Sequence, residues 1–201
     1  MNNLRTLLIA LPCIILSPLA AAHADALDLT VDVGTAKQKG DRFSESDSSI
    51  GLSLGYELTS NWSLNLSYTD FGKAQMQSAT LVSPDNSYQV FRYIKTKGLG
   101  LTAQYLTDPL LGDWAFGARF GVMHVDTKMI DLVPDFSGDL DNTTLDSGSA
   151  PTVGLLASYR LTGQMNLIVS ADFMAPEVQT YTNASEDIKT TRFAVGLNYH
   201  F

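Results

Sequence analysis

The chain has 201 residues, a formal net charge of −8 and 45% hydrophobic residues, a length that suits one domain. An acidic chain without a basic patch is poorly suited to nucleic acid, so no nucleic-acid partner is expected. The single cysteine, Cys13, lies in the N-terminal apolar segment, so the rest of the chain cannot form an internal disulfide.

Residues 1–24 have the pattern of a secretory signal peptide. Arg5 supplies the positive charge, Leu7 to Ala22 form the apolar stretch, and Ala22-His23-Ala24 is a suitable cleavage sequence. Cleavage after Ala22 would serve as well as cleavage after Ala24. A membrane anchor is the alternative, but the apolar stretch is short and interrupted by prolines. The expected division is a signal peptide over residues 1–24 and one mature domain over residues 25–201.

Period-two alternation recurs along the rest of the chain and predicts strands with two different faces. One face of each predicted strand carries bulky apolar residues, and the other carries Gly, Ser, Thr, Asn or charged residues. The predicted strands cover residues 27–35, 50–58, 62–69, 99–106, 114–123, 152–160, 165–173 and 192–201. The stretch 88–97 is ambiguous and could extend the fourth strand.

Short turns and long connections alternate between these strands. The polar stretches Lys37–Ser49, Lys73–Ser87, Asp126–Ser149 and Pro176–Asp187 are predicted as long loops. After the signal segment no apolar run is long enough for a membrane helix, so a membrane protein of this composition must be a barrel. The sequence therefore predicts an all-β fold, an eight-stranded antiparallel up-and-down transmembrane β-barrel, with short periplasmic turns and longer extracellular loops.

The bulky face of these strands is expected to meet lipid. In a soluble barrel bulky apolar residues fill the inside and polar ones face water. The inward set here would have to be Gly, Ser, Thr, Asn and Arg, which cannot fill a core with apolar volume. Aromatic residues on the bulky face fall next to the short turns and the terminus, as in the belt at a membrane interface. The expected periplasmic aromatic belt contains Tyr56, Trp62, Tyr105, Trp114, Tyr159 and Tyr199.

The final strand resembles the closing strand of bacterial outer-membrane barrels, in which a terminal Phe after alternating apolar residues is read by the assembly machinery. The expected assembly signal contains Phe193, Val195, Leu197, Tyr199 and Phe201. The whole mature chain resembles eight-stranded barrels of the OmpA transmembrane-domain, OmpX and opacity-protein type. The segments that carry this resemblance are Tyr68–Lys73, Ala118–Val122, Pro151–Gly154 and Asn198–Phe201.

The resemblance implies a location in the bacterial outer membrane. It also implies contact with outer-membrane lipids and lipopolysaccharide, and with the barrel assembly machinery. Because the matching motifs are short, they indicate the fold and leave the function open.

The inward face of the predicted barrel carries both signs of charge. Charges enclosed in a narrow barrel must be paired or hydrated, which predicts a polar plug. Arg119 lies near mid-barrel, and Glu57, Asp172 and Asp32 are its possible partners. A gated ion path is the alternative to a plug. The expected lumen charge network contains Asp28, Asp32, Glu57, Arg119, Arg160, Asp172 and Arg192.

No catalytic, cofactor or metal site is predicted. His124, which is close to Asp126, and His200 lie in no motif typical of lipid-modifying barrels, and Asp139-Leu-Asp141-Asn142 lacks the Gly and Glu of a calcium loop. The expected role is structural or adhesive, through acidic extracellular loops that bind a host or surface ligand. The alternatives are a small-solute channel and, less favoured, a lipid-modifying outer-membrane enzyme.

Overall fold

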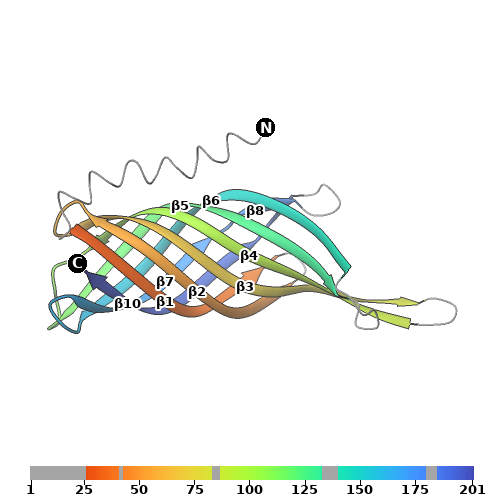
Figure 1. Ribbon diagram of the computed structural model, residues 1–201, viewed down its shortest axis with the longest axis horizontal. Coiled ribbons are helices and arrows are strands. Elements are labelled where there is room, and N and C mark those ends of the chain that lie inside the picture. Colours follow the sequence, from red (N-terminus) through yellow and green to blue (C-terminus); the bar gives the residue numbers. More distant parts are fainter. Residues whose placement is uncertain (1–25, 41–42, 83–86, 133–139, 180–184) are drawn as a thin grey trace.

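The computed structural model describes residues 26–40, 43–82, 87–132, 140–179 and 185–201. Eight of its strands close into one antiparallel barrel in the order β1-β10-β7-β6-β5-β4-β3-β2 (Figure 1), which confirms the predicted fold. The barrel strands are β1 (Leu27–Lys39), β2 (Ser44–Glu57), β3 (Trp62–Val82), β4 (Ser87–Leu106), β5 (Trp114–Leu132), β6 (Leu140–Arg160), β7 (Met165–Met174) and β10 (Lys189–His200). No helix in these described ranges could span a membrane by length and apolarity.

The strands are staggered around the barrel. A path from one paired position to the next, once around the wall, starts at Gln38 on β1 and passes through each of the remaining strands. It returns to β1 at Asp28, ten positions from its start. A stagger of this kind tilts the strands against the barrel axis and leaves an interior only wide enough for side chains. The short connections 58–61, 107–113 and 161–164 lie at one end, called here the turn end, and the opposite end is called the hairpin end.

The predicted long loops are wrong in extent, because most residues of the first three continue the barrel strands. Within the predicted loop Lys37–Ser49, β1 runs to Lys39 and β2 begins at Ser44. The ambiguous stretch 88–97 belongs to β4. Within the fourth predicted loop, β8 (Glu177–Gln179) and β9 (Ser185–Asp187) form a separate two-stranded sheet. Polar residues do not end these strands. The backbone N–H and C=O groups of an antiparallel pair bond to each other, and one face of the pair can meet water.

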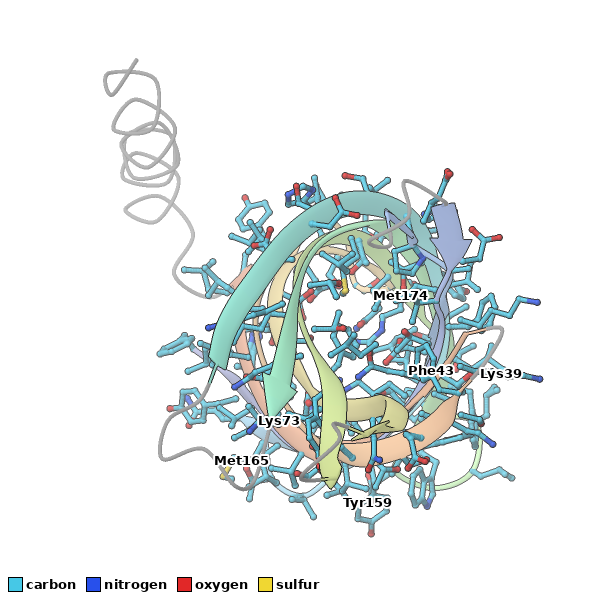
Figure 2. All side chains as sticks on the ribbon, turned by 90° about the vertical axis from the view of Figure 1, so that its right-hand side faces the viewer. Lys39, Phe43, Lys73, Tyr159, Met165 and Met174 are labelled. Carbon is cyan, nitrogen blue, oxygen red and sulfur yellow. The ribbon has the colours of Figure 1, made fainter. Side chains whose placement is uncertain are left out.

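The outward face between the two ends is a continuous apolar band. Leu101, Phe120 and Leu155 are 54–68% exposed although they lie in regular strands. At the turn end, Trp62 is directly opposite Tyr105 and Trp114 is opposite Tyr159, with ring centroids 5.1 and 5.0 Å apart. In the view along the barrel, Tyr159 and Met165 lie on the outside of the ring of strands and Met174 lies inside it (Figure 2).

The side-chain pattern inverts towards the hairpin end. There the inward residues Ile94 and Val125 are fully buried, and the residues that follow them, Lys95 and Asp126, point outward. The expectation that the inward face contains only small and polar residues is therefore wrong for this half. Beyond the apolar band the charged residues lie outside, and the inside holds apolar residues together with the buried polar residues Gln38, Thr96, Thr127 and Thr190.

Candidate functional site

The middle of the lumen is crossed by two ion pairs. Arg119 on β5 reaches Asp172 on β7, with Nε donating to Oδ1 at 2.6 Å and Nη2 to Oδ2. Nη2 also donates to the Ser170 hydroxyl at 3.2 Å. Of the three partners that the sequence left open for Arg119, the structure selects Asp172. The fork geometry uses both carboxylate oxygens, as is typical of strong arginine–carboxylate pairs.

The second pair joins the first and last strands of the barrel. Arg192 on β10 donates to Asp32 Oδ1 on β1 through Nη2, and to Ser49 Oγ on β2 at 3.0 Å through Nε. Arg192 is only 4% exposed. A buried charge of this kind is tolerated because it is paired and hydrogen-bonded.

Glycines opposite these carboxylates provide the space for the pairs. Asp32 faces Gly51 on one neighbouring strand and Gly196 on the other. A Cβ at residue 51 would lie 2.5 Å from Asp32 Oδ1, and a Cβ at residue 196 would lie 2.5 Å from Asp32 Cβ. Gly154 stands in the same relation to Asp172. The inward glycines therefore leave room for charged side chains on the strands beside them.

An apolar core closes the lumen between the ion pairs and the hairpin end. One cluster contains Ala36, Phe71, Met123, Val125 and Met174, and a second contains Phe43, Ala74, Ile94 and Ile188. A cavity of about 40 Å³ separates the ion pairs from Phe71 and Met123. A volume this small holds at most a few water molecules. In the described lumen the paired charges are thus followed by two apolar clusters, and the polar side chains of Gln38, Thr96, Thr127 and Thr190 are also buried towards the hairpin end.

The turn end of the lumen opens into a polar cavity of about 270 Å³. His200 Nδ1 lies 3.2 Å from Asp28 Oδ1 and 3.7 Å from Glu57 Oε1. Their candidate ligand atoms lie within 4.8 Å of one another, so these three residues could hold a metal ion. Arg160 lines the same cavity and forms no ion pair with another described residue. The seven residues expected in one lumen network therefore fall into two mid-barrel pairs and this group at the turn end.

A Ser, a His and an Asp also meet on the outward face near the hairpin end. His124 on β5 is directly opposite Ser149 on β6, with Nδ1 3.0 Å from the serine Oγ. His124 Nε2 is 3.9 Å from Asp126 Oδ1. Sequence reasoning noted the histidine and the aspartate but missed Ser149, because only strand pairing brings it close. The separation between His124 and Asp126 exceeds a hydrogen bond.

Comparisons with known proteins agree on the fold. A family model described as outer membrane protein beta-barrel domain matches residues 6–201. The structure of Neisserial surface protein A is similar at 16% identity and a TM-score of 0.61, over 88% of this chain and 97% of that chain. Ail of Yersinia pestis, the attachment invasion locus protein, has 12% identity and a TM-score of 0.49 over 87% of this chain and 98% of its own.

The outer membrane protease OmpT of Escherichia coli has 14% identity and a TM-score of 0.47, over 89% of this chain and 97% of its own. No curated protein matches the sequence. At these identities the likeness concerns the fold alone, and the similar structures differ in the activities that their names state.

Proposed function

Because the chain belongs to the outer membrane protein β-barrel domain family, and so lies in the bacterial outer membrane, we propose that it is a non-conducting anchor for surface-interacting hairpins. The expected resemblance to small eight-stranded outer-membrane barrels is confirmed by the family match. In such barrels the short turns face the periplasm and the longer connections face outward. The hairpin end is then extracellular.

The observation that carries this proposal is the closed lumen beneath long hairpins. A channel needs a continuous polar path, but the described lumen ends at Phe71, Met123 and Val125. The strands nevertheless continue past this core: β3 and β4 remain paired as far as Val82 and Ser87. Ordered hairpins that project from a closed barrel favour recognition outside the cell over transport. Acidic residues in 126–146 suit a basic host or surface ligand.

The hairpins can be tested one at a time. Gln75 is paired with Tyr93, so replacing residues 76–92 by Asn-Gly would shorten the β3–β4 hairpin without changing its register. Lys128 is paired with Leu145, and replacing residues 129–144 would shorten the β5–β6 hairpin. Bacteria that display each variant are counted after washing on cultured epithelial cells and on glass, with folding verified by heat-modifiable gel mobility. At least one folded variant should lose adhesion. Full adhesion by both would contradict the proposal.

The proposed barrel acts through binding and not through catalysis. The one observation that favours the alternative, an enzyme acting on outer-leaflet lipid esters, is the contact of His124 with Ser149. His124 Nε2 lies 3.9 Å from Asp126 Oδ1, too far for the hydrogen bond that would orient the histidine as a general base. Release of fatty acid from lipopolysaccharide by the parent, and its loss in Ser149→Ala, would overturn the non-enzymatic proposal.

A further inference from the structure

Three side chains of metal-binding types meet at the turn end of the lumen, where the barrel closes on itself. His200 at the end of β10 is directly opposite Asp28 near the start of β1. Asp28 is directly opposite Gly55 on β2, and Glu57 lies two positions further on the same inward face of β2. Figure 1 shows the C-terminus at the end of the barrel where β1 begins. Three neighbouring strands, the first and the last among them, therefore supply one side chain each.

The distances between these side chains suit a small divalent metal ion. His200 Nδ1 is 3.2 Å from Asp28 Oδ1 and 3.7 Å from Glu57 Oε1. Ligand atoms about 2.0–2.2 Å from a tetrahedral zinc ion lie about 3.3–3.6 Å from one another. A small adjustment of the side chains would therefore bring all three atoms onto one ion. The fourth position would be open to water from the turn-end cavity, which the three residues line.

The charges at the turn end differ from those in the middle of the lumen. There Asp32 and Asp172 each pair with an arginine of their own. Asp28 and Glu57 instead share one imidazole, and neither forms an ion pair with a lysine or arginine of the described residues, although Arg160 lines the same cavity. Enclosed charges are stable when they are paired. A divalent cation would compensate both carboxylates, which one protonated histidine cannot do.

The backbone holds these ligands in place before any ion arrives. The His200 N–H donates to Gln164 O at 2.8 Å, which fixes the end of β10. A Cβ at residue 55 would lie 3.2 Å from Asp28 Cβ and 3.3 Å from Asp28 Oδ2, so Gly55 keeps space beside the carboxylate. The side chains of His200 and Glu57 are 30% and 42% exposed. An ion would therefore reach a largely preformed site from the turn end.

We propose that Asp28, Glu57 and His200 bind a divalent transition-metal ion of the zinc type, which fastens β1 and β2 to β10 where the barrel closes. Zinc accepts imidazole nitrogen and carboxylate oxygen together. Calcium and magnesium fit less well, because they prefer a larger set made of oxygen ligands alone. The proposal goes beyond the anchor function and depends neither on adhesion nor on a closed lumen.

The test measures zinc binding to the purified, untagged protein in detergent micelles by isothermal titration calorimetry. The parent should bind one zinc ion per chain. His200→Gln, Asp28→Asn and Glu57→Gln should each bind at least about tenfold more weakly, because even loss of an outer-shell partner weakens a metal site that much. His124→Gln is the matched control, since the other described histidine has one carboxylate nearby, that of Asp126 at 3.9 Å. This variant should bind zinc as the parent does.

Two further measurements separate a zinc site from a simple contact between a histidine and carboxylates. Zinc should raise the urea midpoint of the parent but not that of His200→Gln, because only a folded state that binds the ion is stabilised by it. A large excess of calcium should not displace zinc from the parent. Heat-modifiable mobility verifies that each variant folds, and the calcium competition needs the parent alone.

Three results would overturn the proposal. The first is a parent that binds no zinc in one-to-one ratio, and the second is equal weakening of zinc binding by His200→Gln and His124→Gln. The third is displacement of zinc by calcium, because the carboxylates would then attract cations without the histidine.

Discussion

Arg119 holds both carboxylate oxygens of Asp172 across an intervening strand. The two residues lie on β5 and β7, and Gly154 of β6 is directly opposite each of them. Arg192 follows on β10, directly opposite Asp172, although it pairs with Asp32. The Arg119–Asp172 pair therefore joins two strands that share no ladder, and Gly154 between them makes this contact possible. The Arg192–Asp32 pair joins β10 and β1, which are paired directly.

A side chain at residue 154 should break the pair. A Cβ there would lie against Asp172 Oδ1 and 3.1 Å from Arg119 Cγ. Gly154→Ala is expected to lower the free energy of unfolding by about 1–3 kcal/mol, the usual cost of overpacking. Urea unfolding in micelles measures the change. Gly163→Ala is the matched control, since a Cβ at residue 163 meets nothing within 4 Å. Equal effects of the two substitutions would contradict the role given to Gly154.

Removal of the Arg119 guanidinium should destabilise the barrel more than removal of a guanidinium that forms no ion pair. Arg119→Ala leaves the Asp172 carboxylate without its bidentate partner. We expect the free energy of unfolding to fall by at most about 3 kcal/mol, the lower end of the cost of breaking a buried ion pair. The cost stays low because water from the turn-end cavity can hydrate the carboxylate. Arg160→Ala is the control, since Arg160 lines that cavity without an ion pair to a described residue. Unfolding midpoints that fall equally would argue against a structural role for the pair.

The fold follows from the sequence wherever bulky apolar residues alternate with small or polar ones and face outward. Eight segments with bulky residues on one face were enough to predict strand number, direction and the turn end. The aromatic pair Trp62 and Tyr105 illustrates why. Each residue lies beside a short turn, and the turn fixes its height along the barrel axis. Pairing of Arg119 with Asp172 could not be predicted, since it depends on the barrel stagger and on the glycine of the strand between.

The prediction of loops at the hairpin end was wrong because the apolar residues face inward there instead of outward. Above the apolar band Ile94 points inward and Lys95 points outward, the reverse of the pattern below it. On β3 a register shift between Asp70 and Lys73, with Gly72 at a φ of 76°, also interrupts the period of two. A polar stretch with an interrupted period is typical of a loop, and only the three-dimensional pairing shows that it is strand.

The end of β10 should matter for assembly. Phe201 N–H donates to Leu27 O at 3.1 Å, and the Phe201 ring lies 5.1 Å from the ring of Tyr199. Phe201→Ser is expected to leave precursor in the periplasm and reduce folded barrel in the outer membrane, because the alternating apolar terminus is the proposed signal for the assembly machinery. Fractionation followed by heat-modifiable mobility measures both amounts. Surface exposure equal to that of the parent would refute this role.

Asp47 should give the hairpin end a pH dependence. Pairing of β2 with β3 ends at Ile50 and Asp70, and beyond it the Lys73 amide donates to Asp47 Oδ2 at 2.7 Å. This hydrogen bond lowers the pKa of Asp47 below its ordinary value of 3.8. A carboxyl whose pKa is lowered by folding stabilises the folded state above that ordinary value. The stabilisation is lost as the pH falls through the folded-state pKa.

The corresponding measurement is the difference in unfolding free energy between the parent and Asp47→Asn across the acid range. The parent should be more stable at pH 6, and the difference should shrink as the pH falls below about 4. Glu45→Gln removes the same charge from an exposed position of β2 and serves as the control. A difference that stays constant down to pH 2, or that grows as the pH falls, would contradict the assigned linkage.

The central claim is that the barrel is closed, and single-channel recording in planar bilayers tests it most directly. The purified, folded protein is inserted, and its orientation and integrity are verified by protease digestion of the hairpins. With two ion pairs and an apolar core across the lumen, most insertions should show no current or only rare, brief openings. A steady conductance in most insertions would mean that water fills the lumen, and the channel function would then replace the anchor proposed here.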